Sequence, residues 1–114
     1  MTLIDSTNND IQIIKISGEV DIYNCNNLKQ MFMTKLEQGF KKFLFDMDEL
    51  TYIDSSGIGI LIFIKTTVNK NGGKMVVTGV KDSVHKIFEL TKLSSFFTIA
   101  DEQADGIDIL TKTE

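Results

Sequence analysis

Short apolar runs that suit β-strands alternate along this chain with longer segments that suit helices, and this alternation constrains the fold most. Residues 11–17, 43–45 and 75–77 are predicted strands, and residues 97–99 predict a short last strand. Helical periodicity is predicted over residues 25–38, 58–71 and 84–90, and more weakly over 104–110, where Gly106 intervenes. Such alternation predicts an α/β sandwich: a mixed sheet of about four to five strands with helices packed against it.

The expected ends of the helices rest on glycine and on short polar side chains. Asp21 or Asn24 is predicted to cap the first helix, and Gly39 is predicted to end it. Asp82 or Ser83 is predicted to cap the third helix in the same way. Such residues satisfy backbone groups that a helix leaves unpaired at its ends.

The composition limits the classes of partner and site that this chain can have. All twelve basic residues are lysines and the formal charge is −4, so a nucleic-acid partner is not expected. No segment reads as a secretory signal or reaches about 20 apolar residues, so we expect a cytoplasmic protein without membrane insertion. Cys25, the only cysteine, is expected in the core, and His85, the only histidine, is expected to be a surface or structural residue. We therefore expect one domain over residues 1–114 with no metal site and no cofactor.

Residues 54–57, Asp-Ser-Ser-Gly, precede the second predicted helix and form the candidate site. Asp and Ser are favoured N-caps, so the segment can be explained as a helix cap alone. However, it offers three capping side chains where one would serve, and Gly57 and Gly59 each cost the helix about 1 kcal/mol relative to alanine. Glycines let another surface approach closely, and a serine at an accessible helix N-terminus suits a phosphate group. A serine of this segment is therefore a candidate for carrying a phosphate, and Asp21 and Ser55 are predicted to lie near strand-to-helix junctions at one edge of the sheet.

Four segments of the chain resemble one known family, in order and without large gaps. Residues 52–59, Tyr-Ile-Asp-Ser-Ser-Gly-Ile-Gly, resemble the signature of bacterial anti-sigma factor antagonists in the STAS domain family. Residues 18–21, Gly-Glu-Val-Asp, resemble that family's acidic turn after its early strand. Residues 71–77 resemble the turn and strand after its central helix, and residues 84–91 resemble its next helix. The resemblance covers nearly the whole chain and implies a single STAS domain over residues 1–114.

The resemblance implies a switch protein and not an enzyme. It implies that the unphosphorylated chain binds an anti-sigma factor that is also a serine kinase, and thereby frees a sigma factor. It further implies that the kinase phosphorylates Ser55 and so releases the chain, and that a metal-dependent serine phosphatase restores it. Asp21 matches the family's acidic residue beside the phosphorylated serine. The residues expected to bind the partner are Asp21, Asp54, Ser56, Gly57, Ile58 and Gly59.

Three other interpretations remain open from the sequence. STAS-like domains also serve as accessory subunits of transporters and signalling scaffolds, some without phosphorylation, and Ser55 would then be a cap only. Asp54, Ser55 and His85 could suggest a hydrolase, but the chain lacks the Gly-x-Ser-x-Gly elbow that such an enzyme would use. The acidic residues 46, 48 and 49 could bind a cation, although a solvated acidic loop after the strand at 43–45 is the favoured expectation.

Overall fold

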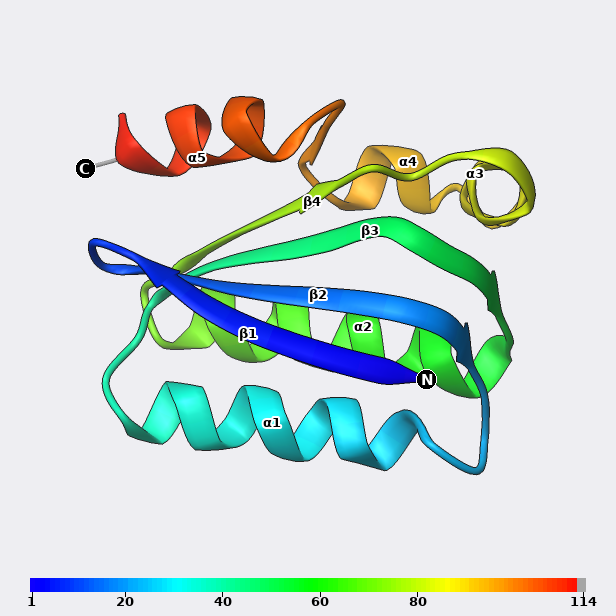
Figure 1. The fold of residues 1–114 in the computed structure, drawn as a ribbon, viewed down its shortest axis with the longest axis horizontal. Helices are drawn as coiled ribbons and strands as arrows, with labels where there is room; N and C mark the ends of the chain where they lie inside the picture. The colour runs from blue at the N-terminus through cyan, green and yellow to red at the C-terminus, as the bar shows by residue number, and fades with distance from the viewer. Residues whose placement is uncertain (113–114) are drawn as a thin grey trace.

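A single mixed sheet organises the chain, and the computed structural model describes it over residues 1–112 (Figure 1). Strand β1, Thr2–Asn8, pairs antiparallel with β2, Ile11–Val20. Strands β3, Lys42–Ile53, β4, Lys74–Thr78, and β5, Ile99–Ala100, follow as parallel neighbours, so the strand order is β1-β2-β3-β4-β5. The mixed α/β sheet predicted from the alternation of elements is confirmed.

Helices cover both faces of this sheet. Helices α1, Cys25–Glu37, and α2, Ser55–Lys70, lie side by side on one face, whereas α5, Gln103–Thr111, lies on the other (Figure 1). Helix α3, Asp82–Leu90, and the one-turn helix α4, Leu93–Phe96, connect β4 to β5. The central strands are therefore buried between two helical layers.

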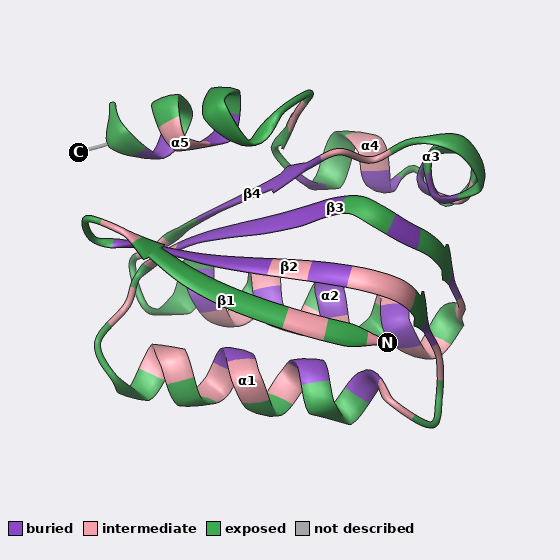
Figure 2. Ribbon diagram, viewed as in Figure 1, coloured by how far each residue is buried: buried purple, intermediate pink, exposed green. Residues whose placement is uncertain are grey.

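The core has two parts, one on each face of the sheet. The larger part packs Phe43 and Phe45 of β3 against the layer of α1 and α2, and Phe32 of α1 meets Phe43 edge-on at a centroid distance of 4.9 Å. The smaller part packs Leu44 of the same strand with Leu110 of α5. Successive side chains of a strand point to opposite faces, so a strand covered on both sides must be apolar throughout. Figure 2 shows buried residues along β4 and the first half of β3, and mostly exposed residues along β1 and the second half of β3.

The sequence pattern did not indicate β1 and placed the end of β3 too early. The residues of β1 are mostly exposed because it is an edge strand, so they carry little of the apolar alternation that marks a strand. Strand β3 continues past residue 45 through its acidic residues to Ile53, and it stays paired with β2. The predicted acidic loop is therefore wrong. Helix α4 was not expected, and β5 begins at Ile99 and not at residue 97.

The predicted end of α1 at Gly39 is confirmed, but the predicted N-cap hydrogen bonds of α1 and α3 are not found. Gly39 has a φ of +103° just beyond α1 and ends that helix as predicted. Asn24 precedes α1, but its side chain makes no capping hydrogen bond. The predicted cap of α3 is wrong, because Asp82 is already helical and Ser83 Oγ donates to the carbonyl oxygen of Thr51 at 2.8 Å. This hydrogen bond from Ser83 connects the start of α3 to β3.

Helix α5 forms although Gly106 lies within it, and the structure gives the reason. A Cβ atom on Gly106 would lie 2.7 Å from Thr78 Cγ2 and 2.8 Å from Leu44 Cδ1. The glycine therefore lets α5 pack closely against β3 and β4. Burial of Leu110 against the sheet offsets the roughly 1 kcal/mol that a glycine costs a helix.

The edge strand β1 is tied to α1 by an ion pair, and this contact predicts a pH dependence of stability. Lys35 Nζ lies 2.9 Å from Asp5 Oδ2, and the hydrogen bond from Lys35 lowers the pKa of Asp5 below its ordinary value. A lowered carboxyl pKa stabilises the folded chain fully above the ordinary pKa of about 4, and this stabilisation is lost as the pH falls through the folded-state pKa. Because the pair is half-exposed, its contribution should stay below about 1 kcal/mol.

An Asp5→Asn variant is therefore expected to unfold with a weaker pH dependence between about pH 5 and pH 3 than the wild-type chain. Urea unfolding at several pH values measures the free energy of unfolding of both chains. As a control, about 1 M NaCl should reduce the difference, because salt screens a half-exposed pair. Parallel pH profiles for the two chains would show that Asp5 contributes nothing through its charge.

Candidate functional site

Asp54 joins the β3–α2 junction to the neighbouring β2–α1 turn. Its Oδ1 accepts a hydrogen bond from the Gly57 N–H at 3.0 Å, which makes Asp54 the N-cap of α2. Its Oδ2 accepts from the Ile22 N–H at 3.1 Å, and its own N–H donates to the Val20 carbonyl oxygen at 3.1 Å. The expected capping role is confirmed, and both carboxylate oxygens are engaged by backbone amides.

The side chain of Asp21 stabilises the β2–α1 turn by accepting hydrogen bonds from backbone N–H groups of the same turn. Its Oδ1 accepts hydrogen bonds from the N–H groups of Tyr23 at 2.9 Å and Asn24 at 3.1 Å, and Asn24 Oδ1 accepts from the Asp21 N–H at 2.9 Å. Asp21 therefore forms a side-chain turn before α1 and does not cap the helix itself. Since the turn that contains Asp21 is bonded to Asp54, the prediction that Asp21 and Ser55 share one edge of the sheet is confirmed.

Ser55 is the first residue of α2, and its side chain is exposed, whereas the neighbouring Ser56 is half-buried. Gly59 and Ile62 follow at spacings of four and three residues and are also exposed, so they lie with Ser55 on one outer stripe of the helix. A helix N-terminus carries a partial positive charge and favours an anion. Ser55 is therefore the more accessible of the two serines.

The two glycines of the candidate segment differ in the structure although they look alike in the sequence. Gly57 is buried, and a Cβ atom there would lie 2.6 Å from Ile53 Cγ1 and 2.8 Å from Val20 Cγ1. Gly59 is exposed, and a Cβ atom there would meet nothing within 4 Å. An alanine at Gly57 would therefore crowd the core, whereas an alanine at Gly59 would not. Gly57 packs the start of α2 against the sheet, and only Gly59 offers an open surface.

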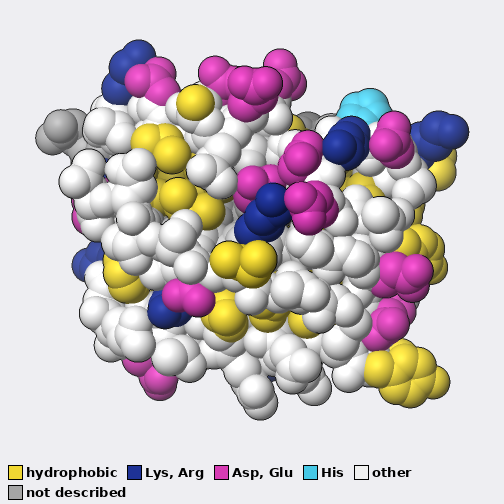
Figure 3. Space-filling view, viewed as in Figure 1, with side chains coloured by type: hydrophobic (Ala, Val, Ile, Leu, Met, Phe, Trp, Pro, Cys, Tyr) yellow, Lys and Arg dark blue, Asp and Glu magenta, His cyan; other side chains and the backbone are white. Residues whose placement is uncertain are grey.

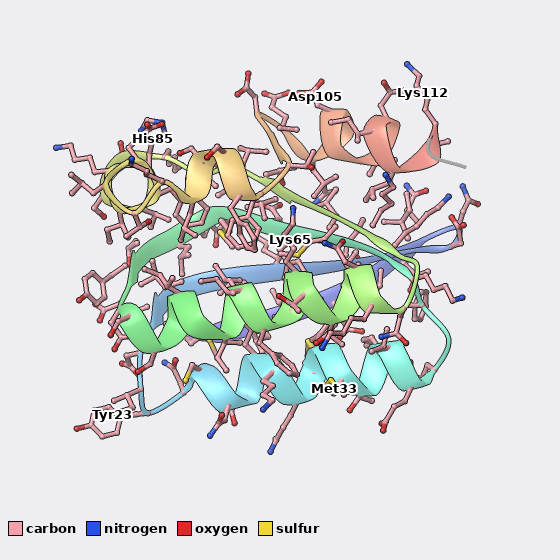
Figure 4. All side chains as sticks on the ribbon, turned by 180° about the vertical axis from the view of Figure 1, so that it is seen from behind. Tyr23, Met33, Lys65, His85, Asp105 and Lys112 are labelled. Atoms are coloured by element: carbon pink, nitrogen blue, oxygen red, sulfur yellow. The ribbon has the colours of Figure 1, made fainter. Side chains whose placement is uncertain are left out.

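Exposed apolar side chains surround this junction, and the sequence interpretation did not single them out. Ile22 is 64% exposed, Tyr23 is 93% exposed and Tyr52 is 45% exposed. We call these three residues the apolar rim. Figure 4 shows Tyr23 at the outer end of the β2–α1 turn, pointing away from the molecule. Ile22 and Tyr23 are apolar residues in a polar turn, which is a signal that could have marked them, whereas Tyr52 lies within β3. Exposed apolar residues that gather on a surface are typical of a protein-binding site.

The remaining candidates lie elsewhere and are engaged locally. His85 is exposed on α3, away from the start of α2 in Figure 4, and its Nε2 lies 3.3 Å from Glu89 Oε1, so the expectation of a surface residue is confirmed. Cys25 is buried in the larger core, as expected. Lys15 Nζ lies 3.0 Å from Glu49 Oε2, and the hydrogen bond from Lys15 lowers the pKa of Glu49. Within residues 1–112, no three acidic, histidine or cysteine side chains converge in a way that could hold a metal ion.

The helices between residues 1 and 112 include none that is long and apolar enough to cross a membrane.

Comparisons with known proteins agree with this architecture. The STAS domain family matches residues 3–106. A Bacillus subtilis (strain 168) protein named anti-sigma-B factor antagonist is 26% identical over 104 residues, which cover 91% of this chain and 94% of that protein. The crystal structure of a candidate anti-sigma factor antagonist from Thermotoga maritima has a TM-score of 0.91 at 20% identity, and the match covers 96% of this chain and 95% of that one.

A third comparison concerns a phosphorylated protein of the same fold. The Bacillus cell fate determinant SpoIIAA in its phosphorylated form has a TM-score of 0.74 at 18% identity, with 94% of this chain and 97% of that chain covered. At such identities the two structural likenesses establish the fold alone. The family match extends over nearly the whole chain, and the strand order and helical layers agree with it. The chain therefore belongs to the STAS domain family, as its four resembling segments had indicated.

Proposed function

We propose that this chain is an anti-sigma factor antagonist that works as a phosphorylation-controlled binding module and not as an enzyme. Its unphosphorylated form binds an anti-sigma factor with serine kinase activity and so frees a sigma factor in the cytoplasm. Phosphorylation of Ser55 ends the binding, and a metal-dependent serine phosphatase restores it. The observation that carries the proposal is the exposed Ser55 at the start of α2, beside the apolar rim.

The apolar rim supplies the driving force for binding in this proposal. Ile22 and Tyr23 keep most of their surface in water in the free chain, so a partner that covers them gains hydrophobic contact. Aromatic side chains such as Tyr23 and Tyr52 are enriched where protein interfaces are strongest. The Ile22 amide is bonded to Asp54, the residue before Ser55, so a partner that covers the rim also reaches the serine.

The electrostatic environment of Ser55 suits a switch. Asp54 cannot turn away from a phosphate on Ser55 without losing its hydrogen bonds to Gly57 and Ile22. In the free chain, water and the positive end of α2 accommodate the added charge. In a complex, water is excluded, and the phosphate is pressed against fixed carboxylates. The same group is therefore tolerated by the fold and disfavoured by the interface.

The proposal is tested by mixing the purified chain with a serine-kinase anti-sigma factor from the same genome, with and without Mg·ATP. Calorimetry should detect a complex without ATP, and mass spectrometry after ATP addition should place one phosphate on Ser55. The phosphorylated chain, purified again, should bind more weakly. A stable complex that ATP neither modifies nor weakens would contradict the switch and favour a non-phosphorylated accessory role.

Asp21 allows a separate test of the charge beside the serine. An Asp21→Asn variant keeps the Oδ1 acceptor for the Tyr23 and Asn24 amides, so the turn and the melting temperature should be preserved. Asp21→Ala, the matched control, removes that acceptor and should cost about 1 kcal/mol of stability. If the charge contributes, the Asn variant will bind the anti-sigma factor more weakly or be phosphorylated more slowly. Unchanged binding and phosphorylation kinetics would restrict Asp21 to shaping the turn.

A further inference from the structure

A pocket lies at the end of the molecule where β3 and β4 begin, whereas Ser55 follows the other end of β3. Its volume is about 440 Å³, which is typical of a site for a small molecule. The loop from α1 to β3, the turn from α2 to β4 and the turn from β1 to β2 enclose it. We call it the lysine pocket, and its lining includes Asp10, Phe40, Lys41, Lys42, Gly73 and Lys74.

The backbone of the lysine pocket is closely packed and hydrogen-bonded within the chain. The Gly73 N–H donates to the Val68 carbonyl oxygen at 2.9 Å at the end of α2, and the Lys74 N–H donates to the Lys41 carbonyl oxygen at 2.9 Å. A Cβ atom on Gly73 would lie 2.2 Å from the Lys41 carbonyl oxygen, so the glycine lets the two loops meet. Since these backbone groups already have partners, recognition of a ligand falls to the side chains.

Three lysines line the pocket against a single carboxylate. Lys42 Nζ lies 3.3 Å from Asp10 Oδ2. Lys41 and Lys74 are exposed, and neither forms an ion pair with an acidic side chain among residues 1–112. Figure 3 shows acidic side chains gathered between α5 and β3 and along the right-hand edge, away from the end at which β3 begins. The pocket therefore has an excess of positive charge in a chain whose formal charge is −4.

Phe40 gives the same pocket an apolar side. Phe40 is half-buried and packs against the larger core, and it leaves part of its surface to the pocket. The aliphatic stems of lysines add apolar surface, while their ammonium groups offer three N–H donors each. Aromatic rings pair favourably with one another in offset or edge-on contacts. The ligand that matches these features carries both an apolar ring and an anionic group.

We propose that the lysine pocket binds a small aromatic carboxylate, whose carboxylate group is bound by Lys41 and Lys74 and whose ring packs against Phe40. A cation would be repelled by the excess of ammonium groups. An inorganic anion would satisfy the ammonium groups but would leave the surface of Phe40 in water. The pocket shares no residue with the apolar rim or with residues 54–59, so the inference does not depend on the proposed switch.

The proposal is tested by NMR titration of the full chain with four probes. Phenylacetate carries both features, phenylacetamide keeps the ring without the charge, acetate keeps the charge without the ring, and inorganic phosphate is a general anion. Phenylacetate should shift the backbone amides of Gly39, Phe40 and Gly73 and should saturate, with a dissociation constant of about 1 mM or tighter. The other three probes should each bind at least severalfold more weakly.

Three variants make the test specific. Lys41→Gln and Lys74→Gln each remove one unpaired charge and should weaken phenylacetate binding severalfold, with little change in the melting temperature. Lys86→Gln is the matched control, because Lys86 is an exposed lysine of α3 outside the pocket, and it should leave binding unchanged. Equal binding of any other probe, shifts at the pocket that do not saturate, or equal affinities of all three variants would each overturn the proposal.

Discussion

A Ser55→Ala variant is expected to bind the anti-sigma factor as tightly as the wild-type chain, and ATP should not release it. A Ser55→Asp variant is expected to bind poorly even without ATP. Both changes are at an exposed first position of α2, so neither should disturb the fold. Melting temperatures close to that of the wild-type chain would confirm that any loss of binding arises at the interface.

The size of the effect follows from the charge that phosphorylation adds. A phosphoserine carries about −1.5 to −2 charges at neutral pH. Two like charges about 4 Å apart repel by roughly 4 kcal/mol at an effective dielectric of about 20. Even half of this energy would weaken binding about thirtyfold. The chain contains no arginine that could neutralise the phosphate, so dissociation is the available relief.

The measurement is calorimetry of each variant with the anti-sigma factor, before and after incubation with Mg·ATP. Ser56→Ala is the matched control, because the half-buried Ser56 should not be the phosphorylated residue and this variant should still be released by ATP. A phosphate mapped to Ser56, or equal affinity of the phosphorylated and unmodified chains, would refute this mechanism.

A Gly57→Ala variant is expected to lose stability, by about 1–3 kcal/mol, because the added methyl group would overlap Ile53 and Val20. For a domain of this size, each kcal/mol lowers the melting temperature by roughly 3–8 °C. Gly59→Ala is the matched control two residues away. Its methyl group would point into open space, so it should keep or raise stability by up to about 1 kcal/mol.

Urea unfolding of both variants measures this difference directly, and binding of the anti-sigma factor by Gly59→Ala measures the separate role of the open surface. If the partner lies along the outer stripe of α2, the methyl group on Gly59 should weaken binding in a chain that is fully folded. Equal stability of the two variants would mean that Ile53 and Val20 can move aside, and that the burial of Gly57 is not structurally required.

Much of this fold could be predicted because its signals are local. The continuous apolar run at residues 43–45 marks a strand buried on both faces, and the structure places it between the layer of α1 and α2 and helix α5. The segment around Asp54 marks a helix start, and Asp54 indeed caps α2. The choice of Ser55 came from the family resemblance of residues 52–59, and its exposure was established by the structure.

The extent of β3, the strand β1 and the apolar rim could not be predicted from the sequence. The acidic residues after residue 45 suggested an exit from the sheet, yet hydrogen bonds from β2 hold them in β3. Residues 2–8 form a strand through pairing with β2 alone, with little burial to select apolar side chains. The apolar rim was missed for the opposite reason, because exposed apolar residues look like core residues until the fold shows that nothing covers them.

The sequence by itself thus determined the alternation of the central strands and helices and the capped start of α2. Only the tertiary structure decided that Gly57 is buried while Gly59 is open, and that Phe40, Lys41 and Lys74 line one pocket. The physical reason is the range of the interactions involved. Helix capping and strand burial act within a few residues, whereas packing and electrostatics act between segments that are brought together only when the sheet forms.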